Sequence, residues 1–252
     1  TAYEWTRPQE EALFELERHY GASFGNGLAW LLPFSQLDDL APFREVELNG
    51  RVALSTLQVV HRRARRIVEL DCVSPDPNVS VGAAVVRELL DGKVVLVDVS
   101  GLGSTEEVLV ASFLTRRLLD EWSSVYLDDP DRHEKRMPVV AVALEEAQRV
   151  LSSSRDRESN VFPRVAREGR KFKVGLVAVT QQPKLLDNEL LSQFNTFFIL
   201  GLADEKDRNI LRSSSKQDLA GLGPEIQTLM PGECLVANLS APFAVPAKVH
   251  LW

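Results

Sequence analysis

From residue 93 onward, short apolar segments alternate with segments of helical length, and this alternation restricts the chain to few folds. Strands that alternate with helices pack as a parallel sheet with helices on both faces. We therefore predict an α/β fold for residues 91–252. The predicted strands are Lys93–Val99, Pro138–Leu144, Val174–Thr180 and Thr196–Leu200, and the predicted helices are Glu106–Tyr126, Glu158–Phe172, Asn188–Phe194 and Asp204–Arg212.

Residues 1–90 have a different pattern, which predicts a mostly helical region. Apolar residues recur at helical spacing over Pro8–Tyr20 and Leu54–Leu70. The second predicted helix carries the basic run His61–Arg66. We interpret this run as a solvated helix face, with a contact to DNA or to a neighbouring subunit as the alternative.

The C-terminal segment predicts a terminal β-hairpin at the edge of the sheet. Glu233–Leu239 and Phe243–Leu251 are rich in β-forming residues, and Ser240–Pro242 joins them. Two polar stretches, Asp128–Lys135 and Ser152–Asn160, are predicted to be exposed loops.

The charge balance argues against a protein that coats DNA with its whole surface. The 29 Lys and Arg residues are outnumbered by 36 Asp and Glu residues, which gives a net charge of -7. Nonspecific DNA binding depends on many phosphate contacts from basic residues. A few basic residues on pore loops remain compatible with an acidic exterior.

Other whole-chain features indicate a cytoplasmic protein without a membrane span. No apolar run reaches the roughly 18 residues of a transmembrane helix, and the start of the sequence is unlike a signal peptide. Cys72 and Cys234 are far apart and lack metal-ligand spacing, so neither a disulfide framework nor a zinc site is predicted. Because the chain starts at Thr1 without an initiator Met, we expect it to be a fragment.

The clearest candidate site follows the predicted strand Pro138–Leu144, which ends abruptly in Glu145 and Glu146. Ligands of open α/β sheets lie beyond the carboxyl ends of the strands. The pair has the form of a Walker B element, in which one acid holds Mg²⁺, usually through water, and the other polarises the water that attacks the γ-phosphate of ATP. Alternatively, the two glutamates only stabilise a helix N-terminus.

A second apolar strand, Val174–Thr180, is followed by Gln181, Gln182 and Pro183. The side-chain amide of Gln181 can hydrogen-bond both to attacking water and to a γ-phosphate, so it is our candidate nucleotide sensor. In the alternative interpretation, it is a polar residue that begins a turn before Pro183.

Three arginines, Arg164, Arg167 and Arg170, recur at three-residue steps between these two strands. The planar guanidinium group suits phosphate, and in a ring of subunits such a stripe can supply an arginine finger to the neighbouring subunit's nucleotide. Ion pairs with nearby acidic residues on a solvated face are the competing interpretation.

Four segments resemble, in their order and spacing, the HerA family of bacterial and archaeal DNA translocases. They are Leu144–Gln148, Ala166–Phe172, Val174–Pro183 and Asn195–Leu202. The match extends over residues 93–252, whereas the first ninety residues match only loosely.

The resemblance implies a RecA-like P-loop ATPase core in a homo-hexameric ring that pumps double-stranded DNA. It also implies a NurA-type nuclease as partner in processing broken DNA ends. Individual roles follow for matching residues: Glu145 takes the Mg²⁺ position, Glu146 the catalytic-base position and Gln181 the sensor position. Arg170, or else Arg167, takes the position of the arginine finger that acts in trans; Arg170 is preferred because it lies nearest the sensor strand.

The chain departs from the family in one respect, since it contains no G-x-x-x-x-G-K-[ST] loop to hold the phosphates of ATP. Gly101–Thr105 follows a predicted strand but has no lysine, and we interpret it as a turn. We expect the P-loop strand to lie upstream of Thr1, so that the sheet of this C-terminal fragment is incomplete. The fragment alone is then expected to hydrolyse ATP negligibly.

Three other functions compete with this prediction. A conjugation or secretion ATPase shares the P-loop core and the Walker B layout. A noncatalytic scaffold could keep a degenerate ATPase fold as an assembly platform. A simple DNA-binding module ranks last, because it would be expected to carry a basic patch.

Overall fold

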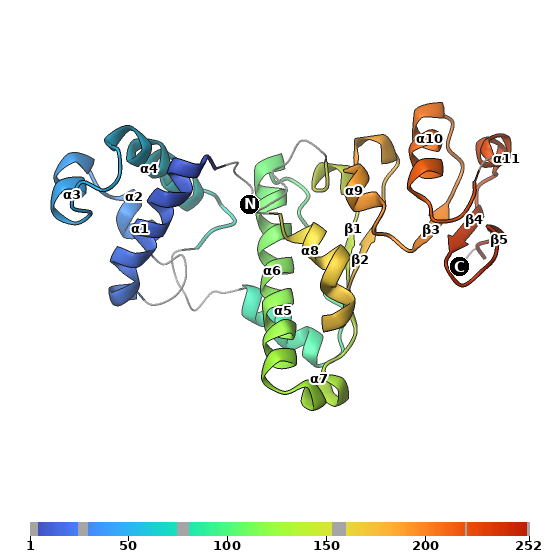
Figure 1. Ribbon diagram of the computed structural model, residues 1–252, viewed down its shortest axis with the longest axis horizontal. Coiled ribbons are helices and arrows are strands. Elements are labelled where there is room, and N and C mark those ends of the chain that lie inside the picture. Colours follow the sequence, from blue (N-terminus) through green and yellow to red (C-terminus); the bar gives the residue numbers. More distant parts are fainter. Residues whose placement is uncertain (1–4, 25–29, 75–80, 153–159, 220, 251–252) are drawn as a thin grey trace. The chain divides into compact units, whose positions relative to one another are not determined.

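The computed structural model describes residues 5–24, 30–74, 81–152, 160–219 and 221–250 (Figure 1). The chain divides between residues 84 and 85 into two compact units, each of which is described by itself. No helix in the described ranges is both long enough and apolar enough to cross a membrane.

The N-terminal unit is helical, as the sequence predicts. Its helices are α1 (Arg7–Phe24), α2 (Leu31–Ser35), α3 (Leu40–Val46) and α4 (Leu54–Val68). Helix α4 contacts the other three, and its buried residues include His61 and Ala64 from the basic run. The arginines Arg62, Arg65 and Arg66 of that run are exposed.

The C-terminal unit begins within α5 (Val81–Leu90), which spans the division between the units. Next come the long helix α6 (Ser104–Asp128) and the short helix α7 (Pro130–Arg136). Trp122 of α6 is completely buried, and its indole Nε1 donates a hydrogen bond to the carbonyl oxygen of Pro138 at 2.9 Å. This bond fixes α6 to the start of the next strand.

Two parallel strands, β1 (Val140–Leu144) and β2 (Val174–Ala178), form the first sheet. The register pairs Val140 with Val174 and Leu144 with Ala178. Between them the chain forms η2 (Ala147–Arg149), α8 (Val161–Glu168) and η3 (Gly169–Phe172). Helix α8 packs against both β2 and α6 (Figure 1).

The remaining strands form a separate antiparallel sheet in the order β3-β4-β5. Its strands are β3 (Thr196–Ile199), β4 (Glu233–Asn238) and β5 (Val245–Lys248), accompanied by η4 (Pro183–Leu185), α9 (Asn188–Leu191), α10 (Glu205–Ser214) and α11 (Gly223–Thr228). A small core that includes Ile199, Leu211 and Ile226 lies beneath this sheet. The predicted C-terminal hairpin is confirmed as β4-β5. Its predicted place at the edge of the parallel sheet is wrong, because β4 pairs with β3 in this separate antiparallel sheet.

The α/β class, the parallel strand pair and the helical N-terminal region are confirmed, but the predicted strands of the sheet are wrong in two further places. Lys93–Val99 is not assigned as a strand, because it has no hydrogen-bonded neighbour among the described strands. Val94 and Leu96 are consequently 98% and 91% exposed. The segment predicted as Thr196–Leu200 is a strand, but it pairs antiparallel with β4 and not with the parallel pair.

Coverage of the parallel pair also differs from the prediction. Val140 and Val174 are buried on one face, whereas Ala141, Gly175 and Val177 are exposed on the other. Helices therefore cover one face of this pair within the described residues, and not both.

The predicted loop Asp128–Lys135 is mostly α7, since Asp129 caps the helix and Pro130 occupies its first turn. Most of the other predicted loop, residues 153–159, lies outside the described residues.

Candidate functional site

The acidic end of β1 lies at the surface and has an unusual backbone conformation. Glu145 and Glu146 directly follow Leu144, and both are exposed. Glu146 has φ 47° and ψ 45°, in the left-handed region that residues with a Cβ rarely adopt. This conformation costs roughly 1–2 kcal/mol, and such strain clusters at functional sites. The turn ends the strand and presents two adjacent carboxylates at the carboxyl edge of the sheet.

The end of β2 lies directly beside these carboxylates. The backbone amide of Val179 donates to the carbonyl of Leu144 at 2.9 Å, and the amide of Ala147 donates to the carbonyl of Val179 at 2.9 Å. Gln181 follows two residues later and is exposed. The structure therefore brings the two strand-end acids and the candidate sensor segment to the same edge of the sheet.

Side chains connect the two strand ends as well. The amide Nε2 of Gln148 donates to Oε2 of Glu146 at 2.6 Å, and the hydroxyl of Thr180 donates to Oε1 of Gln148 at 2.5 Å. The backbone amide of Gln182 in turn donates to Oγ1 of Thr180 at 3.0 Å. These three bonds, which we call the Gln148 relay, link the β1 carboxylate to the segment that carries Gln181.

The turn that bears Glu146 is anchored from the other side by α6. Arg149 Nη2 lies 2.7 Å from Oε1 of Glu107, a residue in the first turn of α6 whose side chain is 7% exposed. Charge-assisted contacts of this length are stronger than neutral hydrogen bonds. Ala147 is completely buried between these anchors. The residues that follow Glu146 are therefore held in place on both sides.

The arginine stripe lies away from this edge. Arg164 and Arg167 are on α8, and Arg170 is on η3, shortly before β2 begins. Because β2 runs from η3 toward the carboxyl edge, Arg170 lies at the amino end of the strand, opposite Glu146. The structure does not bring the arginines together with the acids of the same chain.

The three arginines differ in their partners. Arg164 pairs with Glu168 at 3.6 Å, and Arg167 pairs with Glu189 of α9 at 3.8 Å. Arg170 is exposed, and its guanidinium makes no ion pair or hydrogen bond within the described residues. Ion pairing on a solvated face therefore accounts for Arg164 and Arg167 but not for Arg170.

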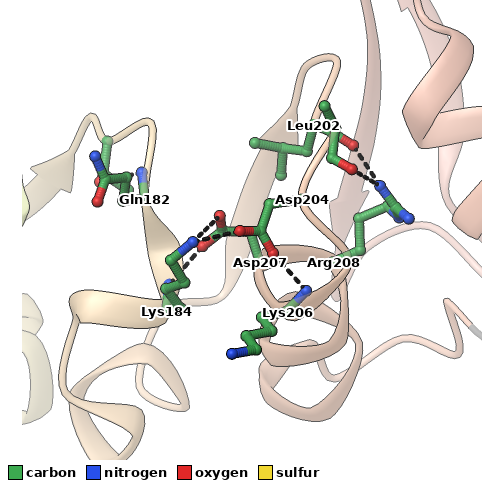
Figure 2. A network of polar contacts seen from close by, with 9 residues as sticks. Gln182, Lys184, Leu202, Asp204, Lys206, Asp207 and Arg208 are labelled. Atoms are coloured by element: carbon green, nitrogen blue, oxygen red, sulfur yellow. Dashed lines mark hydrogen bonds and ion pairs between the residues drawn. The ribbon is translucent and has the colours of Figure 1, made fainter.

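The segment after Gln181 is tied to the N-terminus of α10. Figure 2 shows Lys184 reaching from this segment toward Asp204 and Asp207. The ammonium group pairs with Asp204 and lies 3.4 Å from Oδ2 of Asp207, and the backbone amide of Lys184 donates to Oδ1 of Asp207 at 2.9 Å. We call these contacts the Lys184 clamp. They fix the far end of the loop that carries Gln181.

The Lys184 clamp also changes the ionisation of its members. The hydrogen bond from Lys184 lowers the pKa of the Asp204 carboxyl, and the backbone amide of Lys206 lowers it further. The same hydrogen bond to Asp204 raises the pKa of Lys184, although desolvation opposes this change. Both groups are therefore held in their charged forms.

The strand-end acids fit the ligand preference of Mg²⁺. Proteins commonly bind this ion through one or two carboxylates and leave the other positions to water and phosphate oxygens. Within the described ranges, Glu145 has no hydrogen-bond or ion-pair partner, so its carboxylate is available to a water-mediated ion. No cluster of three or more metal-ligating side chains occurs among the described residues.

Curated relatives of this chain are helicases of the HerA family. The DNA double-strand break repair helicase HerA of Saccharolobus solfataricus is 30% identical over 169 residues, which cover 67% of this chain and 33% of the relative. HerA of Pyrococcus furiosus is 25% identical over 198 residues, covering 69% and 36%. HerA of Sulfolobus acidocaldarius is 30% identical over 154 residues, covering 60% and 30%.

These similarities confirm the resemblance to the HerA family that the sequence motifs indicate. The chain spans about a third of the length of these relatives. No family model matches it. Among solved structures, the sulfate complex of the genome-packaging NTPase B204 from Sulfolobus turreted icosahedral virus 2 aligns with a TM-score of 0.47 and 14% identity, covering 66% of this chain and 72% of B204.

Two sets of polar contacts near this edge are not apparent from the sequence. Gln148 and Thr180 lie in segments that carry the family resemblance, but strand periodicity gives no sign that their side chains meet. Lys184 had a clearer signal. It is a basic residue in the loop after the second strand, and an acidic helix start follows later in the chain at Asp204. Only the structure shows that these residues meet.

Proposed function

We propose that this chain supplies the Walker B acids and the nucleotide sensor of the ATP site in a DNA-translocating ATPase of the HerA type. One observation carries the proposal: two parallel strands deliver an acid pair, with Glu146 in a strained left-handed conformation, and the Gln181 segment to one edge of a sheet. The HerA relatives favour this function over a conjugation or secretion ATPase.

Each residue at the edge has a distinct task in hydrolysis. Glu145 would hold Mg²⁺ through water, and the ion would supply positive charge next to the phosphates. Glu146 orients and polarises the attacking water through its carboxylate. Gln181 contacts that water or the γ-phosphate through its side-chain amide, so that its position depends on the nucleotide present.

Arg170 acts on the site of a neighbouring subunit in a homo-hexameric ring, with Arg167 as the second candidate. The guanidinium of Arg170 is exposed and has no partner in the described part of the chain. Arg170 lies at the opposite edge of the sheet from Glu146. A residue placed in this way cannot reach the acids of its own chain, but it can face the nucleotide of an adjacent copy. Arginine fingers supplied in trans accelerate phosphoryl transfer by about 10³–10⁵-fold.

Double-stranded DNA is the proposed track, and a NurA-type nuclease is the proposed partner in processing broken ends. The relatives' name, double-strand break repair helicase, supports a role on DNA. The net charge of -7 argues against DNA binding over the whole surface, so the proposal assigns the DNA contacts to a few basic residues on loops that line a pore.

The phosphate-binding loop is proposed to come from another part of a longer protein. This sequence has no lysine-containing P-loop, and without one the electrostatic stabilisation of the transition state is largely missing. The chain alone should therefore hydrolyse ATP negligibly. A turnover rate similar to that of the longer protein would contradict this part of the proposal.

A direct test replaces Glu146 by Gln in the full-length protein. Glu146→Gln should lower kcat by about 10²–10⁴-fold, because the amide cannot polarise water as a carboxylate does. Binding of a nonhydrolysable ATP analogue should remain. Glu121→Gln, which changes a half-buried glutamate on α6 that pairs with Arg117 on the same helix, is the matched control and should be fully active. Normal turnover by Glu146→Gln would remove this residue from the catalytic role.

A further inference from the structure

We propose that Gln148 is a positioning residue that orients the Glu146 carboxylate and couples this orientation, through Thr180, to the segment that carries Gln181. The inference rests on the proposed function, because it assumes that Glu146 polarises the attacking water. It adds two residues, Gln148 and Thr180, whose proposed effect on hydrolysis passes through the Glu146 carboxylate.

The direction of the hydrogen bonds in the Gln148 relay allows only one arrangement. The Glu146 carboxylate can only accept, so Gln148 must turn its NH₂ group toward it. The Gln148 carbonyl then faces Thr180 and accepts its hydroxyl proton, which leaves Thr180 Oγ1 to accept from the Gln182 amide. Each donor polarises the next, so the bonds strengthen one another.

The relay limits the freedom of a carboxylate that is otherwise exposed. Glu146 has a flexible side chain at the surface, and Gln148 engages one of its oxygens, Oε2, at 2.6 Å. The other oxygen, Oε1, has no hydrogen-bond partner among the described residues. A hydrogen bond to a charged acceptor is both short and strong, so it can select one orientation of the carboxylate.

Gln148 itself is held rigidly enough to act as a support. It lies on η2 between Ala147, which is completely buried, and Arg149, which contacts the buried side chain of Glu107. Catalytic groups need such support, because small displacements from the productive geometry are costly.

The second partner of Gln148 is Thr180, which lies in the segment that is proposed to move when the nucleotide changes. Thr180 directly precedes Gln181, and the Lys184 clamp fixes the other end of the same loop. A shift of Gln181 on contact with the γ-phosphate would therefore act on Thr180, then on Gln148 and the carboxylate. Two side-chain hydrogen bonds separate the sensor segment from the proposed base.

The test compares variants of the full-length ATPase that keep the shape of the relay but remove its hydrogen bonds. Gln148→Met has nearly the size of glutamine and neither donates nor accepts strongly. Thr180→Val keeps the branched shape without the hydroxyl, and Thr180→Ser retains the hydroxyl. The measured quantities are kcat, the Kd of a nonhydrolysable ATP analogue, and the thermal midpoint of each variant.

We expect Gln148→Met to lower kcat by about 10- to 100-fold, the range typical of a misplaced catalytic group. The Kd of the analogue should change by less than about 2-fold, because binding does not require the orientation of the carboxylate. Thr180→Val should lower kcat less, and Thr180→Ser should restore it. The double variant Gln148→Met/Thr180→Val should be no slower than Gln148→Met, because both changes break the same relay.

Wild-type kcat in Gln148→Met, or fully multiplicative losses in the double variant, would overturn the inference. If Gln148→Met does not fold, Gln148→Asn gives the same information, since its shorter amide cannot reach both partners. Failure of the proposed function is distinguishable, because Glu146→Gln would then stay active. An inactive Glu146→Gln beside a fully active Gln148→Met rejects the relay alone.

Discussion

Gly169 shows how a single residue sets the distance between a helix and a strand. It lies where α8 passes into η3, and a Cβ at this position would be 2.3 Å from the carbonyl oxygen of Val174 and 3.1 Å from Cγ1 of Val165. Its φ of −56° is accessible to any residue, so the constraint is close packing and not backbone conformation.

Gly169→Ala should therefore lower the free energy of unfolding by about 1–3 kcal/mol, as overpacked sites do. Gly175→Ala on β2 is the matched control, since its Cβ would be 3.8 Å from the nearest heavy atom, the carbonyl oxygen of Val140. The control should change stability by no more than about 0.5 kcal/mol. Urea unfolding measures both, and equal stability of the two variants would show that Val174 moves away at no cost.

Residues at strand ends could be placed from the sequence, whereas contacts between their side chains could not. The carboxyl ends of parallel strands meet at one edge, so an apolar run that ends in Glu145 and another that ends before Gln181 already predict neighbours. Periodicity does not encode rotamers. The bond from Gln148 to Glu146 and the left-handed backbone of Glu146 were therefore visible only in the structure.

At the scale of elements, the Lys184 clamp joins the loop after β2 to α10. Because its pKa is lowered in the folded state, Asp204 stabilises the fold fully above its ordinary value of 3.8. This contribution is lost as the pH falls through the lowered pKa. Lys184 has the opposite pH dependence, because its pKa is raised in the folded state. Its contribution to stability is full below pH 10.5 and is lost as the pH rises through the raised pKa.

Asp204→Asn should remove this dependence while keeping the helix cap, since the asparagine oxygen can still accept from the amide of Lys206. The variant should be less stable than wild type at neutral pH, and the difference should shrink as the pH falls below 3.8. Chemical unfolding between pH 2.5 and 7 would follow the difference. A gap that stays constant over this range would show that the ion pair contributes nothing.

Elements with strong periodicity were predicted well, and those that depend on a partner were not. The sequence located β1, β2, the β4-β5 hairpin and the long helix α6 because their apolar spacing is local. Lys93–Val99 has the composition of a strand but is not one in the structure. A strand needs a hydrogen-bonded neighbour, and a local sequence pattern does not show whether one is present. Helix α7 was missed although Asp129 and Pro130 form an N-terminal signal, because its polar composition suggested a loop.

At the scale of the whole molecule, the proposed ATP site needs more than one chain. The acids and the sensor segment share one edge of the parallel pair, and Arg170, whose guanidinium has no partner among the described residues, lies at the opposite edge. The chain spans about a third of its relatives' length. An assembly in which the arginine of one subunit faces the acids of the next satisfies both placements. The proposed action of Arg170 in trans requires this arrangement.

The most direct test mixes two inactive forms of the full-length protein and measures DNA-stimulated ATP hydrolysis. Arg170→Ala lacks the finger but keeps the acids, and Glu146→Gln lacks the base but keeps the finger. Mixed rings contain interfaces where an intact Glu146 meets an intact Arg170, so the mixture should recover activity that neither variant has alone. A mixture as inactive as its components would contradict action in trans, and a wild type without DNA-dependent turnover would favour a noncatalytic scaffold.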